Sequence, residues 1–283
     1  MNKLIQNGFL ILDKPKKMTS REACVKVGKI LCAKKAGNSG TLDPNATGAL
    51  LICFDNATKI MPALQNLDKE YVAVAHMHRD VNNNEIESAI KKFTGTIVQT
   101  PPVRSAVARR PRKRKIYSIE ILDRRERDVK LKIKCQAGTY IRKLISDIGN
   151  EIGGAHMKEL RRIKVGDFSI EQAHTIDEIK HAAEKGDIKK IILPIEIAVS
   201  HLKKIIIKDG AVKSVCNGRP LRRNDILGEK DNECDASSNN IKAGELISLL
   251  TPDKKLVALA RFVGNKTVAR IERVIKISGE ENA

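Results

Sequence analysis

The sequence predicts an α+β fold in which helices cover one face of a sheet. Strand and helix signals alternate through the first 200 residues, and neighbouring strands lie close enough in sequence to form hairpins. Residues 129–135 alternate apolar side chains with lysines, as expected of a strand that buries one face. A fresh set of short strands and turns follows Ser200. We therefore predict two domains, residues 1–200 and residues 201–283.

A helix over residues 20–31 precedes the most distinctive loop of the chain. Thr19 and Glu22 have the spacing of a capping box, and apolar residues recur behind them at helical intervals. The loop at residues 37–48 holds three glycines, one proline and one acid. Residues 49–54 follow as an apolar run of strand length.

The remaining elements follow from the same two periodicities. Thr175 and Glu178 form a second capping box and begin a helix ahead of residues 191–199. A polar, partly acidic stretch predicts a solvated loop over residues 224–240. The pattern predicts strands over residues 71–78, 116–122 and 129–135, and helices over residues 57–67 (despite Pro62), 85–93 and 140–152.

The charge of the chain favours a polyanionic partner. Its 283 residues include 53 Lys and Arg against 34 Asp and Glu, a formal net charge of +19. RNA, DNA or an anionic membrane would satisfy this charge, because cationic side chains release counterions from phosphates. No apolar run approaches the roughly 20 residues that cross a bilayer, and the N-terminus lacks the features of a secretory signal. We expect an intracellular protein.

We expect no metal site and no cofactor. The six cysteines include no C-x-x-C pair, and several lie in apolar stretches, which is typical of buried reduced thiols. His76 and His78 would share one face of a strand, but no third ligand accompanies them. An exposed polar strand face explains both.

Asp43 is the candidate catalytic residue. Pro44 disfavours the helical conformation at the preceding residue, and Gly40 and Gly48 permit sharp turns on either side. The loop would therefore present one carboxylate at a fixed angle. A plain surface turn is the alternative, because Asp-Pro and glycine clusters are also turn chemistry.

Seven cations lie within residues 104–115, a segment without acids that follows the rigid Pro101-Pro102 turn. This density exceeds what solubility requires and predicts a loop that contacts RNA phosphates without reading sequence. A solvated charged face is the alternative. The seven are Arg104, Arg109, Arg110, Arg112, Lys113, Arg114 and Lys115.

Five segments resemble, in order, the motifs of the TruB and dyskerin family of pseudouridine synthases. Residues 37–48 resemble its G-H-S/T-G-T/A-L-D-P-x-A/V-T-G motif, and residues 8–20 resemble its opening motif. The other three segments are Lys69-Glu70-Tyr71, Ala137-Gly138-Thr139-Tyr140-Ile141-Arg142 with Asp147-Ile148-Gly149, and Gly154-Ala155-His156-Met157 through Leu160-Arg161-Arg162. Five such blocks in order do not arise by chance. The resemblance implies a mixed, mainly antiparallel sheet with flanking helices.

The resemblance also implies a reaction. The family isomerises uridine to pseudouridine in RNA without metal or organic cofactor, an intramolecular transfer that exchanges a C–N bond for a C–C bond. It implies Asp43 as the catalytic carboxylate, Arg142 as its cationic partner and Tyr71 as a ring that stacks on the flipped base. Attack on the ribose, attack on the base and removal of a ribose proton all stay open. A structural ion pair and a buried strand aromatic are the plain alternatives.

Four further residues are implied at the substrate: Tyr140 and Leu160 as pocket walls, Asn38 at the position of a substrate-contacting histidine, and Lys14 mainly as scaffold for the Asp43 loop. Residues 201–277 resemble a PUA domain, a small β-barrel that binds RNA. The prolines and arginines of residues 101–115 are more similar to the archaeal and eukaryotic dyskerin branch than to the bacterial TruB branch.

The dyskerin branch works inside the box H/ACA particle, where a guide RNA selects the uridine and small accessory proteins help to place it. The expected partners are therefore tRNA or rRNA, a guide RNA and these proteins, and no membrane. The expected location is cytoplasmic in an archaeal cell and nuclear or nucleolar in a eukaryotic one. The alternatives are a standalone synthase acting on the tRNA T-loop and a catalytically idle RNA-binding scaffold.

Three departures from the family pattern carry their own expectations. Asn38 replaces the usual histidine, so it can form hydrogen bonds but cannot become charged. Lys17 and Met18 replace the Gly-Pro or Gly-x of the opening motif, so we expect a local rearrangement before the first helix. Only seven residues precede Gly8, where relatives carry a longer extension that packs on the PUA domain, which predicts a less firmly docked second domain.

Overall fold

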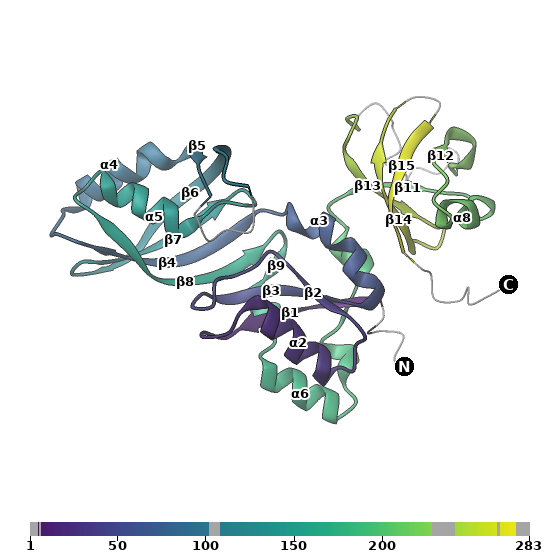
Figure 1. Ribbon diagram of the computed structural model, residues 1–283, viewed down its shortest axis with the longest axis horizontal. Coiled ribbons are helices and arrows are strands. Elements are labelled where there is room, and N and C mark those ends of the chain that lie inside the picture. The colour runs from purple at the N-terminus through teal and green to yellow at the C-terminus, as the bar shows by residue number, and fades with distance from the viewer. Residues whose placement is uncertain (1–4, 6, 102–107, 228–240, 265–266, 276–283) are drawn as a thin grey trace.

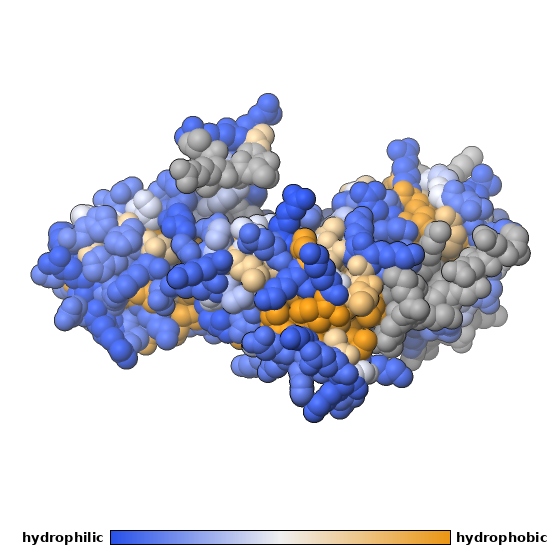
Figure 2. Space-filling view, turned by 60° about the horizontal axis from the view of Figure 1, so that its bottom comes forward, coloured by the Kyte–Doolittle hydropathy of each residue, from blue (hydrophilic) through white to orange (hydrophobic). Residues whose placement is uncertain are grey.

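The computed structural model describes residues 5, 7–101, 108–227, 241–264 and 267–275, and it contains two sheets (Figure 1). The predicted α+β class is confirmed. Charged and polar residues cover most of the face in Figure 2, and the apolar residues visible there gather near its middle. Within the described residues, no helix is long and apolar enough to cross a membrane.

The larger sheet is mainly antiparallel, as predicted. Its strands follow the order β10-β1-β3-β8-β4-β7-β6-β5, with β2 paired to β3 and β9 to β8, and among these described ladders only β3–β8 is parallel. The strands are β1 (Gly8–Lys14), β2 (Ala36–Ser39), β3 (Thr47–Phe54), β4 (Lys69–Met77), β5 (Gly95–Gln99), β6 (Arg112–Arg125), β7 (Asp128–Cys135), β8 (Ala155–Val165), β9 (Phe168–Ser169) and β10 (Leu193–Pro194).

Helices cover this sheet in two groups. Figure 1 shows α4 and α5 together against β4 to β8, whereas α2 and α6 lie beside β1 to β3. Both predicted capping boxes are present, at Thr19–Glu22 and Thr175–Glu178. The α-helices described in the first domain are α2 (Ser20–Ile30), α3 (Met61–Gln65), α4 (Asn83–Phe93), α5 (Ile141–Asn150), α6 (Ile176–Glu184) and α7 (Ile195–Ala198), and the 3-10 helices are η1 (Asp55–Ile60), η2 (Ile170–Gln172) and η3 (Ile188–Lys190).

The alternation in β4 and β7 buries one face, as predicted. Tyr71, Ala73 and Leu131 contribute to a core shared with α4 and α5, whereas the lysines of β7 lie on the opposite face. β4 bridges the two halves of the sheet, because it pairs with β7 on one side and β8 on the other.

The second sheet has its own core and also packs on the first domain. An apolar cluster joins Leu246, Leu256 and Leu259 of this sheet to Ile60 of η1 and Leu64 of α3. Within the described part of the chain, the docking involves η1, α3 and α7. The elements are β11 (Lys203–Ile206), α8 (Asp209–Cys216), β12 (Leu221–Arg222), β13 (Leu246–Leu250), β14 (Leu256–Phe262) and β15 (Thr267–Val274), in the sheet order β11-β13-β14-β15-β12.

Several predicted boundaries change. Residues 57–67 were expected to form one helix, but they divide into η1 and α3, with Pro62 in the first turn of α3, where its missing N–H costs nothing. Residues 223–225 form a short 3-10 helix within the predicted loop 224–240, whose residues 228–240 lie outside the described residues. β8 was not predicted, because the polar sequence of residues 155–165 does not alternate cleanly.

The turn before α2 keeps a glycine-like conformation without a glycine. Lys17 has φ +65°, in the left-handed region that glycine adopts without steric cost. The helix still begins at Ser20 behind its capping box. The structure thus shows a left-handed, strained backbone at Lys17 in this turn.

We predict that Lys17→Gly stabilises the protein. Relief of the left-handed strain should raise the free energy of unfolding by about 1 kcal/mol, partly offset by the larger entropy of glycine in the unfolded chain. Thermal or urea unfolding measures the change. Lys16→Gly removes the same charge at a position without positive φ and should give no gain; equal gains from both variants would contradict the assignment.

Candidate active site

The Asp43 loop is anchored by apolar side chains and displays its acid outward. Leu42 and Ala46 are buried in the core beneath it, whereas Asp43 and Pro44 are exposed. The N–H of Ala46 donates to the carbonyl of Asp43 (3.0 Å) and closes a turn around the acid. The loop therefore has a fixed base and an accessible carboxylate.

Two buried polar side chains hold this loop from α2 and β1. The Ser20 hydroxyl accepts from the N–H of Leu42 (2.9 Å) and donates to the Leu42 carbonyl (3.1 Å). Lys14 donates to the carbonyls of Pro44 (3.2 Å), Pro15 (2.8 Å) and Met18 (2.5 Å). These contacts fix the loop relative to the start of the helix.

Lys14 is a supporting residue rather than a substrate-facing one. Its side chain is fully enclosed, and burial lowers its pKa, while the nearby Asp43 carboxylate acts to raise it. The ammonium is directed at backbone carbonyls. The prediction that Lys14 binds substrate is therefore corrected, and its role as scaffold is what the geometry supports.

Asp43 and Arg142 form an ion pair at the surface. Arg142 Nη2 lies 3.2 Å from Asp43 Oδ2, and the two side chains are 59% and 56% exposed. An exposed pair of this kind contributes about 0–1 kcal/mol to stability, so the fold does not require it. In the free chain the ion pair is open to water.

Gln99, which the sequence analysis did not single out, sets the start of the helix that carries Arg142. The side chain is buried; its Nε2 donates to the carbonyl of Tyr140 (3.2 Å) and its Oε1 accepts from the N–H of Tyr140 (3.0 Å). Tyr140 is the N-cap residue of α5. The one available signal was a polar residue at the end of a strand before two prolines.

Tyr71 lies beneath the loop. Its ring is buried in the same core as Leu42 and Ala46, and Leu160 packs against that core. Burial raises the pKa of the Tyr71 hydroxyl, while the charge of Arg162 and a hydrogen bond from it act in the opposite direction. The free chain thus presents Tyr71 as a buried strand aromatic next to the candidate acid.

Arg162 was named within a motif but given no role. It is 1% exposed, and its Nη2 donates to the carbonyl of Gly40 (2.8 Å) while its Nε donates to the carbonyl of Ala49 (2.7 Å). These two carbonyls lie at the two ends of the Asp43 loop. The sequence offered one signal for such a role, the two adjacent arginines Arg161-Arg162.

Asn38 faces α2. The Cys24 thiol donates to its Oδ1 over 3.5 Å, and burial raises the pKa of Cys24 to about 11, so this thiol stays a donor. The side chain is half-buried on β2. Its amide oxygen is therefore engaged within the protein.

The basic run is not one loop, which corrects the prediction. From Arg112 onward it forms the start of β6, so successive side chains point to opposite faces. Arg114 Nε donates to the carbonyl of Gly138 (3.1 Å) in the turn that leads to α5, and Lys115 lies 5.4 Å from the ring centre of Tyr117. Arg109 and Arg110 are exposed before the strand, and Arg104 lies outside the described residues.

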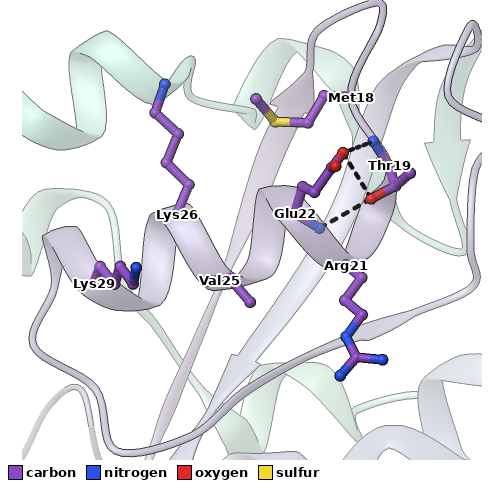
Figure 3. A pocket seen from close by; sticks show the side chains of 7 residues that line it. All are labelled: Met18, Thr19, Arg21, Glu22, Val25, Lys26 and Lys29. Atoms are coloured by element: carbon purple, nitrogen blue, oxygen red, sulfur yellow. Dashed lines mark hydrogen bonds between the residues drawn. The ribbon is translucent and has the colours of Figure 1, made fainter.

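An open hollow lies along the outer side of α2 (Figure 3). None of the candidate catalytic side chains lines it. In Figure 3 Glu22 turns back to Thr19 to complete the capping box, and the lysine side chains point away from one another. Its lining residues are Met18, Thr19, Arg21, Glu22, Val25, Lys26 and Lys29.

Lys69 is a second enclosed lysine near the loop. Its ammonium donates to the carbonyls of Gln65 (2.8 Å) and Leu67 (2.5 Å), and its Cε would lie 3.7 Å from a Cβ placed on Gly40. Burial lowers the pKa of Lys69 from its ordinary 10.5 to about 8.

This pKa predicts a pH-dependent stability. Between pH 8 and 10.5 the unfolded chain holds the Lys69 proton and the folded chain does not, so stability rises with pH. Below pH 8 both states are protonated and the cost of burying the charge is fully present. The free energy of unfolding of the wild type, relative to Lys69→Met, should therefore increase across this window in urea titrations; a constant difference would contradict it.

Two family models match the chain consecutively. The N-terminal domain of TruB family pseudouridylate synthases matches residues 28–141, and the C-terminal domain of tRNA pseudouridylate synthase B matches residues 142–200. A probable tRNA pseudouridine synthase B of Methanopyrus kandleri is 43% identical over 90% of this chain and 75% of that relative. One of Korarchaeum cryptofilum is 42% identical over 96% of this chain and 86% of that relative.

Solved structures give the same result over both sheets. A chain in the crystal structure of a Cbf5-Nop10-Gar1 complex matches with a TM-score of 0.86 and 39% identity, covering 97% of this chain and 86% of that one. A chain in an H/ACA RNP bound to a substrate RNA containing 2'-deoxyuridine matches with a TM-score of 0.83 and 37% identity, covering 98% of this chain and 87% of that one. The fold is that of a pseudouridine synthase followed by a PUA-like domain. By sequence and by structure, the chain belongs to the TruB family of pseudouridine synthases.

Proposed function

We propose that this chain isomerises uridine to pseudouridine in RNA with Asp43 as the catalytic carboxylate. The observation that carries the proposal is an exposed Asp43–Arg142 pair on a loop whose base is fully buried. Such a pair adds little to the fold, yet buried side chains from β1, α2 and β8 hold its loop. Burying polar side chains costs stability, and their use here is explained if the position of the carboxylate matters for function.

The reaction assigns each group a task. The bond between ribose C1′ and the base nitrogen breaks, the base rotates, and a bond from C1′ to the base carbon forms. That carbon releases its proton to solvent, and the freed nitrogen takes up a proton from solvent. Asp43 acts as nucleophile or base, and Arg142 orients and balances its charge. Tyr140, Leu160 and Tyr71 form the wall against which the flipped base rests.

RNA completes the site in this proposal. The ion pair is open to water in the free chain, so exclusion of water awaits the substrate. Arg114 of the basic run donates to the turn before α5, the helix that carries Arg142, and so brings phosphate contacts toward the acid. Asn38 acts through the packing of β2 on α2 unless its amide turns outward on binding.

The guided reaction is the form that we propose. Similarity extends over 97% and 98% of the chain to Cbf5-type chains whose structures are described as a Cbf5-Nop10-Gar1 complex and an H/ACA RNP. The partners would then be a guide RNA, an rRNA or tRNA target and small accessory proteins, inside the cell, in the cytoplasm if the cell is archaeal like those of the relatives above. The names of those relatives favour the second candidate, unguided action on tRNA.

We also propose a division of labour between residues 1–200 and residues 201–283. The first segment carries the Asp43 site and the large sheet, and the second carries the PUA-like sheet that begins at Lys203. The second domain would bind RNA and leave the chemistry to the first.

Asp43→Asn should abolish the reaction. The amide keeps the size of the side chain but supplies neither nucleophile nor base, so we expect tritium release from 5-tritiated uridine in RNA to fall by about 10³-fold or more. Asp209→Asn, an equal change on exposed α8 in the second domain, should retain full release. Release by Asp43→Asn at the level of the control would contradict the proposal.

Two substrates separate the candidate functions. One is a tRNA T-loop stem; the other is a guide–target duplex with the accessory proteins added. Tritium release from the guide–target duplex but not from the T-loop supports guided action. Tritium release from the T-loop by the isolated chain supports standalone action. RNA binding without release from either substrate by the unaltered protein would indicate a catalytically idle scaffold.

The two faces of β6 predict unequal RNA contacts. Arg112→Ala with Arg114→Ala should weaken RNA binding and reduce the slope of log affinity against log salt by about 1.4–1.8. This is the change expected when counterions are no longer released from two phosphates. Lys113→Ala with Lys115→Ala removes the same charge from the other face and should change the slope less. Filter binding at several salt concentrations measures both, and equal slopes would contradict the face assignment.

A further inference from the structure

Arg162 is a buried charge without an evident need in the core. It is the largest side chain among the fully buried ones, and its hydrogen-bond partners among the described residues are carbonyl oxygens rather than carboxylates. A buried charge is costly to desolvate, and an apolar residue of similar size often stabilises a core as well or better. Its donors must therefore serve the groups they contact.

These groups are the two ends of the Asp43 loop. The Arg162 side chain bonds the Gly40 carbonyl before the acid and the Ala49 carbonyl after it. The backbone of Arg162 also pairs with Gly48 across the parallel β3–β8 ladder, so closely that a Cβ on Gly48 would lie 2.1 Å from the Arg162 carbonyl oxygen. One residue thus fixes where the loop leaves and re-enters the sheet.

The third contact is Tyr71. Tyr71 and Arg162 are direct partners across the β4–β8 ladder, at a point where the register shifts. The positive charge of Arg162 lies near the Tyr71 hydroxyl and acts against the effect of burial on its pKa. The loop, the tyrosine and β8 therefore meet at this guanidinium.

We propose that Arg162 is a positioning residue for the isomerisation. By bonding both ends of the Asp43 loop and pairing with Tyr71 across the β4–β8 ladder, it sets the separation between the carboxylate and the ring. The inference rests on the proposed function for its catalytic consequence. The planar fork of arginine places donors on separate nitrogens, so Nε reaches the Ala49 carbonyl while Nη2 reaches the Gly40 carbonyl; all the donors of a lysine lie on one nitrogen.

Arg161 provides a matched control on the same strand. Its side chain points away from Arg162, and it forms a two-armed ion pair with Asp13 of β1, at 2.7 and 3.0 Å. Arg161→Lys and Arg162→Lys therefore make the same chemical change at adjacent positions. Arg161 Nη1 also reaches the Thr47 hydroxyl (3.4 Å), but only Arg162 bonds the Gly40 and Ala49 carbonyls and pairs with Tyr71.

The experiment combines kinetics with tyrosine NMR on the full chain. The chain has three tyrosines, so labelling with ¹³C at Cζ gives three resonances, of which Tyr71→Phe identifies one. We expect Arg162→Lys to fold, to shift the Tyr71 resonance and to lower kcat for tritium release by about 10²-fold with little change in KM. Arg161→Lys should leave the Tyr71 resonance and kcat unchanged.

Wild-type kcat or an unmoved Tyr71 resonance in Arg162→Lys would overturn the proposal. Loss of folding in both Arg162→Lys and Arg162→Met would also overturn it, because the residue would then serve the fold as a whole. The NMR arm does not require activity. If the wild type released no tritium from any RNA, the proposed function would fail, while the Tyr71 shift would still decide whether Arg162 holds this group.

Discussion

Donation from buried cations to loop carbonyls is the interaction on which the site depends. The Asp43 loop turns back between β2 and β3, and carbonyls within it and at its ends accept hydrogen bonds from buried side chains. Lys14 serves the carbonyl of Pro44, and Arg162 serves those of Gly40 and Ala49. The same contacts that satisfy the backbone also prevent the acid from moving.

The rigidity below contrasts with the exposure above. Asp43 and Arg142 face solvent, and their ion pair alone would hold neither side chain in one place. Gln99 fixes the start of α5, which carries Arg142, and the buried cations fix the loop that carries Asp43. Each member of the ion pair is therefore held by its own fixed element. The site is therefore ready in the free chain, and RNA has only to exclude water from it.

Local patterns predicted most of the fold, and long-range pairings account for what they missed. The capping boxes at Thr19 and Thr175 and the alternation in β7 are determined by residues close in sequence. The motifs likewise placed Asp43 and Arg142 in one site. The roles of Gln99 and Arg162 depend on partners 41 to 122 residues away, which no periodicity reports. The density of cations alone predicted one basic loop, but from Arg112 onward the run is a strand whose side chains alternate between two faces.

Amide hydrogen exchange in the free full chain tests the central claim, that the Asp43 loop is held in place before RNA binds. The amides of Leu42 and Ala46 donate to Ser20 and to Asp43, and they lie within the anchored loop. The account predicts exchange of both amides slowed to rates near those of β3, with little further slowing when RNA is added. Exchange of both at the rate of an unprotected loop, slowed only by RNA, would show that the substrate builds the site and would contradict the account.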